Sequence, residues 1–212
     1  MVRKRVSTIE LIKRFRSLDK GFFTIPDLQK ITDLSRDSLK VSISRLVDKG
    51  VLVRIKRGIY QSAFSEVDVP RIANQLYYPS YLSFQSVLSM YSILSQIPYT
   101  QTFATNKKSK TMVLLDTEVE FRQISDDLFF GYEMKDGMYV AKPEKALLDQ
   151  LYMVSRGVGL LNIEELDLRE IDKDLFEKYA MKYPRYMRKL VDKVLKYVGS
   201  ASISNEDKTR IG

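Results

Sequence analysis

The order of hydrophobic patterns in residues 7–62 constrains the fold more than any other feature of the sequence. Apolar residues recur every three or four positions over residues 7–18, as they do on the buried side of a helix. Thr24 and Asp27 have the spacing of a capping box, which predicts that a second helix begins between them. A third helical pattern covers residues 36–49, so three short helices are expected in succession.

Two short β-strand patterns follow in residues 51–60, joined by two cations and a glycine. These turn residues are Lys56, Arg57 and Gly58, and they predict a hairpin with a basic tip. Helix, helix, turn, helix and basic hairpin, in this order, are typical of a winged helix-turn-helix domain, which we place at residues 1–62. In helix-turn-helix domains, the helix after the turn enters the major groove of DNA.

The excess of positive charge lies entirely in this first segment. The chain has 35 Lys and Arg against 27 Asp and Glu, a formal net charge of +8. Residues 1–60 contain 15 of these cations and 6 of the acids, which gives +9, and the remaining 20 cations and 21 acids give −1. Because cations that neutralise phosphates supply most of the non-specific affinity for DNA, the segment is expected to bind double-stranded DNA.

Three groups of residues in the basic segment are expected to contact DNA. Side chains outside the apolar stripe of the third helix would face base edges and flanking phosphates. A flexible N-terminal arm would hold phosphates, and the hairpin tip would contact the backbone or the adjacent minor groove. The residues are Arg3, Lys4 and Arg5 in the arm, Ser35, Arg36, Ser38, Lys40, Ser42 and Arg45 in the helix, and Lys56 and Arg57 in the tip. A solvated basic surface and a protein-docking module are the alternatives.

The chain contains no cysteine and no histidine, which removes several classes of chemistry. Disulfides, thiol catalysis and Ser-His-Asp catalysis are excluded, as are nearly all transition-metal sites. Asp116 and Glu118 could hold metal ions, and Glu144 and Lys145 could form an acid/base pair. A strand-end turn and a capped helix explain these residues better. We therefore expect no enzyme activity, no catalytic residues, no metal site and no cofactor.

No segment of the sequence has the pattern of a membrane span or a signal peptide. No apolar run approaches the ~20 residues that a transmembrane helix needs. The basic residues at the start are followed by an amphipathic pattern and not by a continuous apolar one. We therefore expect a cytoplasmic protein with no membrane partner, and the lack of cysteine fits a reducing compartment.

The rest of the chain is expected to form a connection, a second domain and a mobile tail. The connection is placed at residues 63–76, the second domain at 77–198 and the tail at 199–212. The patterns predict an α+β domain that has a small antiparallel sheet and helices. Strands are expected at residues 111–115, 119–124, 129–134 and 137–141, and helices from Pro70 and at 83–94, 142–152, 163–168 and 173–198.

Four motifs in order along the chain carry a resemblance to a known family. They are Lys-Arg-Gly-Ile-Tyr at residues 56–60, Tyr-Leu-Ser-Phe-Gln-Ser-Val-Leu at 81–88, Ala-Thr at 104–105 and Ala-Lys-Pro-Glu-Lys-Ala-Leu-Leu-Asp at 141–149. The chain resembles the AbiEi antitoxins of type IV toxin-antitoxin (abortive infection) systems, which act in phage defence. The resemblance implies an antitoxin that represses its own promoter, at inverted repeats, through its first domain. It also implies that the second domain counteracts a cognate nucleotidyltransferase toxin, directly or functionally.

The helical segment at residues 173–198 is rich in cations, and Arg185, Arg188 and Lys189 are candidates for a second binding surface. This surface would bind the toxin or DNA beside the hairpin, and a solvated amphipathic helix is the simpler interpretation. Two alternatives to the antitoxin remain: a winged-helix regulator whose second domain senses a ligand, and an enzyme with a winged-helix module. A neighbouring nucleotidyltransferase gene would favour the antitoxin.

Overall fold

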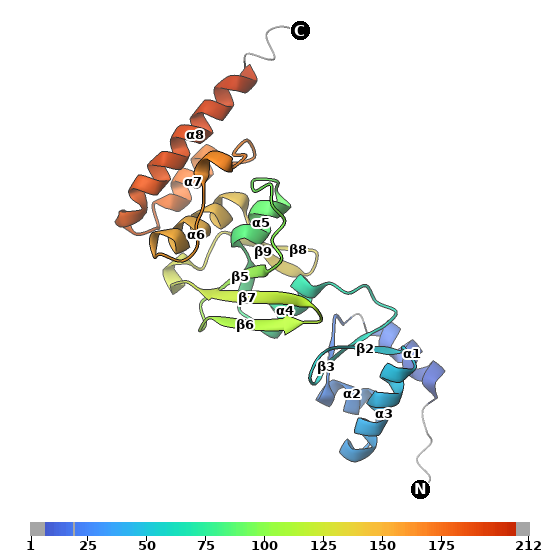
Figure 1. The fold of residues 1–212 in the computed structure, drawn as a ribbon. Coiled ribbons are helices and arrows are strands. Elements are labelled where there is room, and N and C mark those ends of the chain that lie inside the picture. Colours follow the sequence, from blue (N-terminus) through green and yellow to red (C-terminus); the bar gives the residue numbers. More distant parts are fainter. Residues whose placement is uncertain (1–6, 19, 207–212) are drawn as a thin grey trace. The chain divides into compact units, whose positions relative to one another are not determined.

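A computed structural model describes residues 7–18 and 20–206 of the chain, with residues 199–206 described by their backbone alone. Within these residues the protein is a mixed α/β structure with two sheets, shown in Figure 1. The chain divides into two compact units. The N-terminal unit comprises Met1–Ile72 together with Val113–Thr117, and the C-terminal unit comprises the rest.

The N-terminal unit contains the three helices and the hairpin that the sequence predicts, together with one short strand that it does not. In chain order the elements are α1 (Thr8–Ser17), β1 (Phe23–Thr24), α2 (Ile25–Thr32), α3 (Arg36–Asp48), β2 (Leu52–Lys56) and β3 (Ile59–Ser62). β3 lies between β1 and β2 in an antiparallel three-stranded sheet. Because β1 is only two residues long, it has no alternating pattern from which it could be predicted.

Side chains at the helix starts explain where α1 and α2 begin. Ser7 accepts a hydrogen bond from an amide in the first turn of α1 at 3.2 Å. Thr24 and Asp27 form the predicted capping box: the Asp27 amide donates to Thr24 Oγ1 at 3.3 Å and the Thr24 amide donates to Asp27 Oδ2 at 2.8 Å. Ser35 precedes α3 as predicted, but its hydroxyl donates to the Ser38 hydroxyl at 3.0 Å and does not cap the backbone.

The core of the N-terminal unit lies where the three helices meet the sheet. Phe15 of α1 and Phe23 of β1 pack with their ring centroids 5.1 Å apart. Burial of each large apolar side chain contributes about 1.5–3 kcal/mol, so this core fixes α3 against the other two helices. The buried residues are Leu11, Phe15, Phe23, Leu28, Leu39, Ile43, Leu46, Val51 and Leu52.

The chain passes from one unit to the other within α4 (Val69–Leu76), the helix expected from Pro70. The second sheet then has six strands among the described residues, all in the C-terminal unit except for Val113 and Leu114 of β6 and Thr117 of β7. They are β4 (Ser80–Leu82), β5 (Gln101–Thr105), β6 (Lys110–Leu114), β7 (Thr117–Gln123), β8 (Tyr132–Lys135) and β9 (Met138–Ala141). The helices are α5 (Phe84–Met90), α6 (Pro143–Ser155), α7 (Lys173–Ala180) and α8 (Arg188–Glu206).

The C-terminal sheet is mixed, so the expectation of a small antiparallel sheet was wrong. The strand order is β6-β7-β5-β4-β9-β8. β4 pairs antiparallel with β5, and β8 with β9, whereas β5–β7 and β4–β9 are parallel pairs. The two unpredicted strands, β4 and β5, are central and almost entirely buried. A strand buried on both faces lacks the alternation from which strands are predicted.

The last predicted helix, residues 173–198, is divided into α7 and α8. Pro184 precedes a short 3-10 helix at Arg185–Met187 between them, and the missing amide hydrogen of proline prevents a continuous helix. α8 continues to Glu206, beyond the expected end. At 163–168 the predicted helix is only a 3-10 turn, Ile163–Glu165.

The helices of the C-terminal unit form layers on the sheet. α5 packs on β5 and against α6, and α6 in turn contacts α7 and α8. Figure 1 shows α7 and α8 on the side of α6 that faces away from the sheet. α6 is therefore surrounded, and ten consecutive residues in it, Glu144–Met153, are buried.

Candidate DNA-binding surface and buried charge cluster

α3 has a buried side and an outward side. Leu39, Ile43 and Leu46 are buried in the core. At about 100° per residue, Val41 points in the opposite direction, away from this stripe. Most of the predicted contact residues on α3 lie on the outward side, but Ser42 is half-buried. The exposed residues are Ser35, Arg36, Asp37, Ser38, Lys40, Val41, Ser44, Arg45 and Asp48.

A basic hollow lies between α3 and the hairpin. Its cavity measures about 560 Å³, and Arg36 and Lys40 of α3 line it opposite Arg54 and Arg57 of the hairpin. Arg54 was not predicted as a contact, although it is an exposed cation two residues before Lys56 on the same strand. The four guanidinium and ammonium groups are spaced around one concave surface, so they can bind an anion together.

A second hollow, of about 490 Å³, lies on the other side of α3, toward α1 and α2. The residues that line it include Ser38, Val41, Ser42, Arg45 and Lys49. The α3 residues that were predicted to contact DNA are therefore divided between two hollows. The outward side of α3 lies between these hollows, and we call it the ridge. Arg3, Lys4 and Arg5, the predicted arm, lie outside the described residues.

The cations beside this ridge are free to bind an external anion. In the part of the chain that the structure describes, none of the cations at positions 36, 40, 45, 54, 56 and 57 forms an ion pair. Two acids are also exposed on this side of α3: Asp37, which lines the hollow beside the hairpin, and Asp48.

The match to a known family covers this same segment. Residues 10–63 match a family model described as "Transcriptional regulator, AbiEi antitoxin". Over this segment the chain is similar to that family. This confirms the resemblance for the three helices and the hairpin. A search of curated proteins found no match to the chain.

The C-terminal unit, beyond the matched segment, contains a fully buried ion pair. Lys145 Nζ donates to Asp149 Oδ1, one turn later on α6, and neither side chain is exposed to solvent. Asp149 Oδ2 accepts hydrogen bonds from the Tyr81 hydroxyl at 3.0 Å and the Ser83 hydroxyl at 2.8 Å. The Tyr183 hydroxyl donates to Asp149 Oδ1 at 2.8 Å. The carboxylate thus joins the sheet, α6 and the turn between α7 and α8.

Burial sets the ionisation of this cluster. Burial, reinforced by the negative charge of Asp149, raises the pKa of Tyr81 and of Tyr183 well above the usual value. Burial also lowers the pKa of Lys145, and the adjacent carboxylate opposes that change. The Lys145 ammonium lies 5.0 Å from the ring centroid of Phe130, which favours the charged form.

Glu144 and Lys145, the possible acid/base pair, are both engaged in packing. The Glu144 carboxylate accepts a hydrogen bond from the Asp172 amide at 3.0 Å, at the start of α7. Lys145 is enclosed, and a Cβ placed on Gly131 would lie 3.1 Å from its side chain. The interpretation of both residues as parts of a packed helix is confirmed by these contacts.

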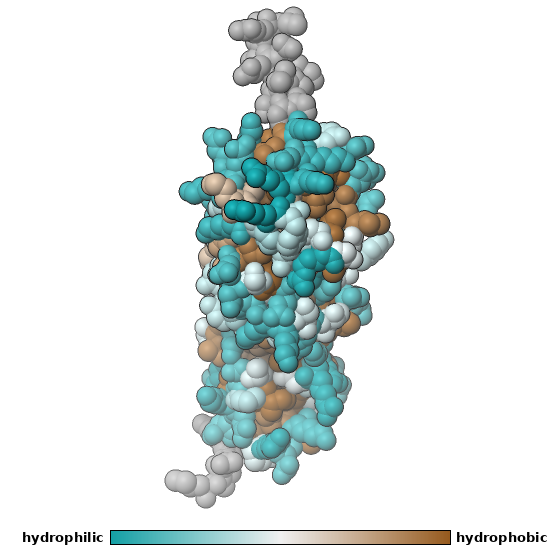
Figure 2. All heavy atoms as spheres, turned by 90° about the vertical axis from the view of Figure 1, so that its left-hand side faces the viewer, coloured by the Kyte–Doolittle hydropathy of each residue, from teal (hydrophilic) through white to brown (hydrophobic). Residues whose placement is uncertain are grey.

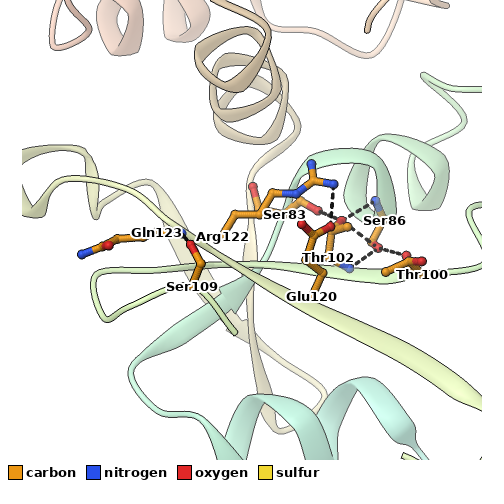
Figure 3. Close-up of polar contacts among 8 residues, drawn as sticks. All are labelled: Ser83, Ser86, Thr100, Thr102, Ser109, Glu120, Arg122 and Gln123. Carbon is orange, nitrogen blue, oxygen red and sulfur yellow. Dashed lines mark hydrogen bonds and ion pairs between the residues drawn. The ribbon is translucent and has the colours of Figure 1, made fainter. Parts of the chain in front are cut away.

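Hydroxyl groups join α5 to β5, as Figure 3 shows. The Ser86 amide donates to Thr102 Oγ1 at 3.3 Å and the Thr102 amide donates to Ser86 Oγ at 2.8 Å, while the Thr102 hydroxyl donates to the Ser83 carbonyl at 2.9 Å. On the neighbouring strand β7, Arg122 Nη2 pairs with Glu120 Oε2 at 2.7 Å. Because the groups of Ser83, Ser86 and Thr102 satisfy one another, we interpret them as packing contacts, whereas Arg122 Nε is buried and has no hydrogen-bond partner among the described residues.

The candidate cations Arg185, Arg188 and Lys189 are all exposed. Arg185 and Arg188 lie at a groove of about 440 Å³ between α7 and α8, and Glu177 and Asp192 line the same groove. Figure 2 shows this end of the C-terminal unit as mainly hydrophilic with hydrophobic areas between the polar side chains. The surface is therefore of mixed charge and not uniformly basic.

The described residues also bear on metal binding and on membrane insertion. They contain no group of three or more acidic side chains that could hold a metal ion. Asp116 lies in the turn between β6 and β7, and Glu118 lies at the start of β7, as the strand-end interpretation predicted. No described helix is both long enough and apolar enough to span a membrane.

Proposed function

We propose that the protein is the antitoxin of a type IV toxin-antitoxin system and represses its own promoter. The N-terminal unit would act as a winged helix-turn-helix domain in the cytoplasm, with α3 in the major groove and the β2–β3 hairpin as the wing. The observation that carries this proposal is the outward ridge of α3, flanked by unpaired cations, within the segment that matches the AbiEi antitoxin family.

The dimensions of α3 support insertion into DNA. A helix with its side chains is about 10–12 Å wide, and the major groove of B-DNA is about 12 Å wide. Arg36, Lys40 and Arg54 lie on one side of the ridge and Arg45 on the other. Cations on both sides of an inserted helix can reach the phosphates that border the groove.

The wing would add contacts beyond the major groove. Lys56 and Arg57 are exposed at the hairpin tip, and Gly58 with φ +80° forms its turn. Such a tip would contact the backbone or the adjacent minor groove. A protein that binds inverted repeats places one such unit on each half-site, so we propose an operator with two-fold symmetry.

The C-terminal unit would counteract a nucleotidyltransferase toxin. Three exposed cations lie close together in the chain at and just before the start of α8: Arg185, Arg188 and Lys189. They would contact an acidic surface of the toxin or flanking DNA. Reversal of these three charges should weaken toxin neutralisation or operator binding in cells that express the toxin. If both remain intact, these residues form neither surface.

Salt-dependent binding to the protein's own upstream DNA tests the regulatory proposal. Arg45→Ala should lower affinity by about 1–3 kcal/mol and reduce the preference for the operator over random DNA. Lys56→Ala should weaken binding to all sequences similarly and reduce the slope of log K against log salt by about 1. Equal affinity of the unaltered protein for upstream and random DNA would refute sequence-specific regulation.

A further inference from the structure

Val41 is an exposed apolar side chain on the outward ridge of α3, at the edge of the hollow toward α1 and α2. It is 52% exposed and lies in the N-terminal half of the helix. The helical rotation of about 100° per residue places it opposite the buried Leu39 and Ile43. In helix-turn-helix proteins, the N-terminal half of the helix after the turn, which corresponds to α3 here, supplies the side chains that contact base edges.

Folding gives no reason for a valine at this position. The core side of α3 is already filled by Leu39, Ile43 and Leu46, so Val41 adds nothing to the core. A β-branched residue also has a lower helix propensity than alanine, lysine or glutamate. Single exposed apolar residues are common on protein surfaces, and the position of Val41 is what distinguishes it.

The neighbours of Val41 on the ridge are polar, and the cations lie to its sides. Ser44 is exposed one turn later on the same side, and Asp37 one turn earlier. Lys40 lines the hollow beside the hairpin, and Arg45 lines the hollow toward α1. If Lys40 and Arg45 bind phosphates on the two sides of the groove, the shorter side chains of the ridge would face the base edges.

We infer that Val41 packs against the C5-methyl group of a thymine in the operator. This inference rests on the proposed binding of α3 in the major groove. The thymine methyl is the apolar group that base edges present there, and small apolar side chains are the groups that contact it. Val41 thereby determines specificity for an A·T pair, which the cations around it cannot do through phosphates.

The test removes the methyl group from the DNA and the side chain from the protein in turn. Binding of the full chain to its upstream DNA is measured by titration, and the bound segment of that DNA is located by nuclease protection. That segment is then synthesised again with each thymine replaced in turn by deoxyuridine. Loss of a contacted methyl should weaken binding about threefold to tenfold per site. In Val41→Ala, which keeps only one methyl group, the same replacement should have a clearly smaller effect. Val67→Ala, which alters an exposed valine outside α3, is the matched control.

The outcomes separate this inference from the proposed function. If Val67→Ala keeps the deoxyuridine penalty and Val41→Ala reduces it at the same thymine, the contact is established. If every replacement affects both variants equally while upstream DNA is still preferred to random DNA, the Val41 contact is wrong and the regulator stands. If no preference for upstream DNA exists, both fail. Alanine favours helices more than valine, so Val41→Ala is expected to retain the fold, which a thermal melt checks.

Discussion

The two units of the protein use cationic side chains in opposite ways. In the N-terminal unit, Arg36, Lys40 and Arg54 are exposed around a hollow and, among the described residues, form no ion pair. In the C-terminal unit, Lys145 has no exposed surface and pairs with Asp149. An exposed cation retains its charge at little cost and can bind a phosphate, whereas a buried one must be neutralised within the fold.

This difference shows which charges serve binding and which serve stability. Removal of an exposed cation such as Arg45 should change affinity for DNA and leave folding nearly unchanged. Removal of Lys145 should destabilise the unit that contains it, because the Asp149 carboxylate would remain buried without its cation. The following variants test that division.

The largest effect is expected for Lys145→Met. Breaking a buried pair by removing one partner costs about 3–5 kcal/mol. Urea unfolding of the full chain, followed by the near-ultraviolet signal of tyrosine, reports on the C-terminal unit, because 12 of the 13 tyrosines lie beyond residue 72 and only Tyr60 precedes it. Lys178→Met, which removes an exposed lysine from α7, is the control. Equal midpoints for the two variants would show that the pair does not stabilise the unit.

A smaller effect is expected for Tyr183→Phe. The hydroxyl accepts from Lys145 at 2.7 Å and donates to Asp149 at 2.8 Å, so its loss should cost about 1–3 kcal/mol. Tyr99→Phe, at a side chain that is 99% exposed, should cost nearly nothing. If the two variants unfold at the same urea concentration, the hydroxyl does not join the turn to α6.

The same variant has a pH signature. Because the pKa of Tyr81 and of Tyr183 is raised in the fold, unfolding releases phenolic protons at alkaline pH. The stabilisation is complete below the ordinary value of 10.0 and is lost as pH rises above it. Tyr183→Phe retains one of these groups, so its stability should fall less steeply with pH above 10.0 than that of the unaltered protein.

The smallest effect is expected for Asp27→Asn in the N-terminal unit. Burial opposes ionisation of Asp27, but hydrogen bonds from Lys20 and Thr24 outweigh it and lower the pKa from 3.8 to about 2. Loss of this charge should cost about 0.5–1 kcal/mol. The contribution is present above pH 3.8 and lost as pH falls toward 2. Acid unfolding of Asp27→Asn is followed by circular dichroism and compared with that of the control Asp33→Asn. If the two variants unfold at the same pH, the charge of Asp27 does not stabilise the unit.

Local features of the N-terminal unit could be predicted because each depends on residues a few positions apart. The capping box needs only Thr24 and Asp27, and the hairpin needs two short apolar runs around Gly58. The outward side of α3 was predicted less well. Ser42 was included because it is polar, although it is half-buried, and Val41 was omitted because it is apolar. Counting the helical angle from the apolar stripe would have corrected both.

The C-terminal unit depends on pairings that no local pattern reveals. β4 pairs in parallel with β9 through Leu82 and Val140, which lie far apart in the sequence. The burial of Lys145 follows from the elements that enclose it, and charged residues are normally exposed. The division between α7 and α8 could have been predicted, because Pro184 lies inside the segment that was taken as one helix.

The placement of the core contacts along the chain has a consequence for synthesis. Every buried residue of the N-terminal core cluster precedes residue 53, whereas β4 lacks its neighbour β9 until Val140 has been made. Domains that depend on nearby residues can fold while the ribosome is still extending the chain. The segment that carries α3 and the hairpin can therefore be complete on a nascent chain before the sheet of the C-terminal unit exists.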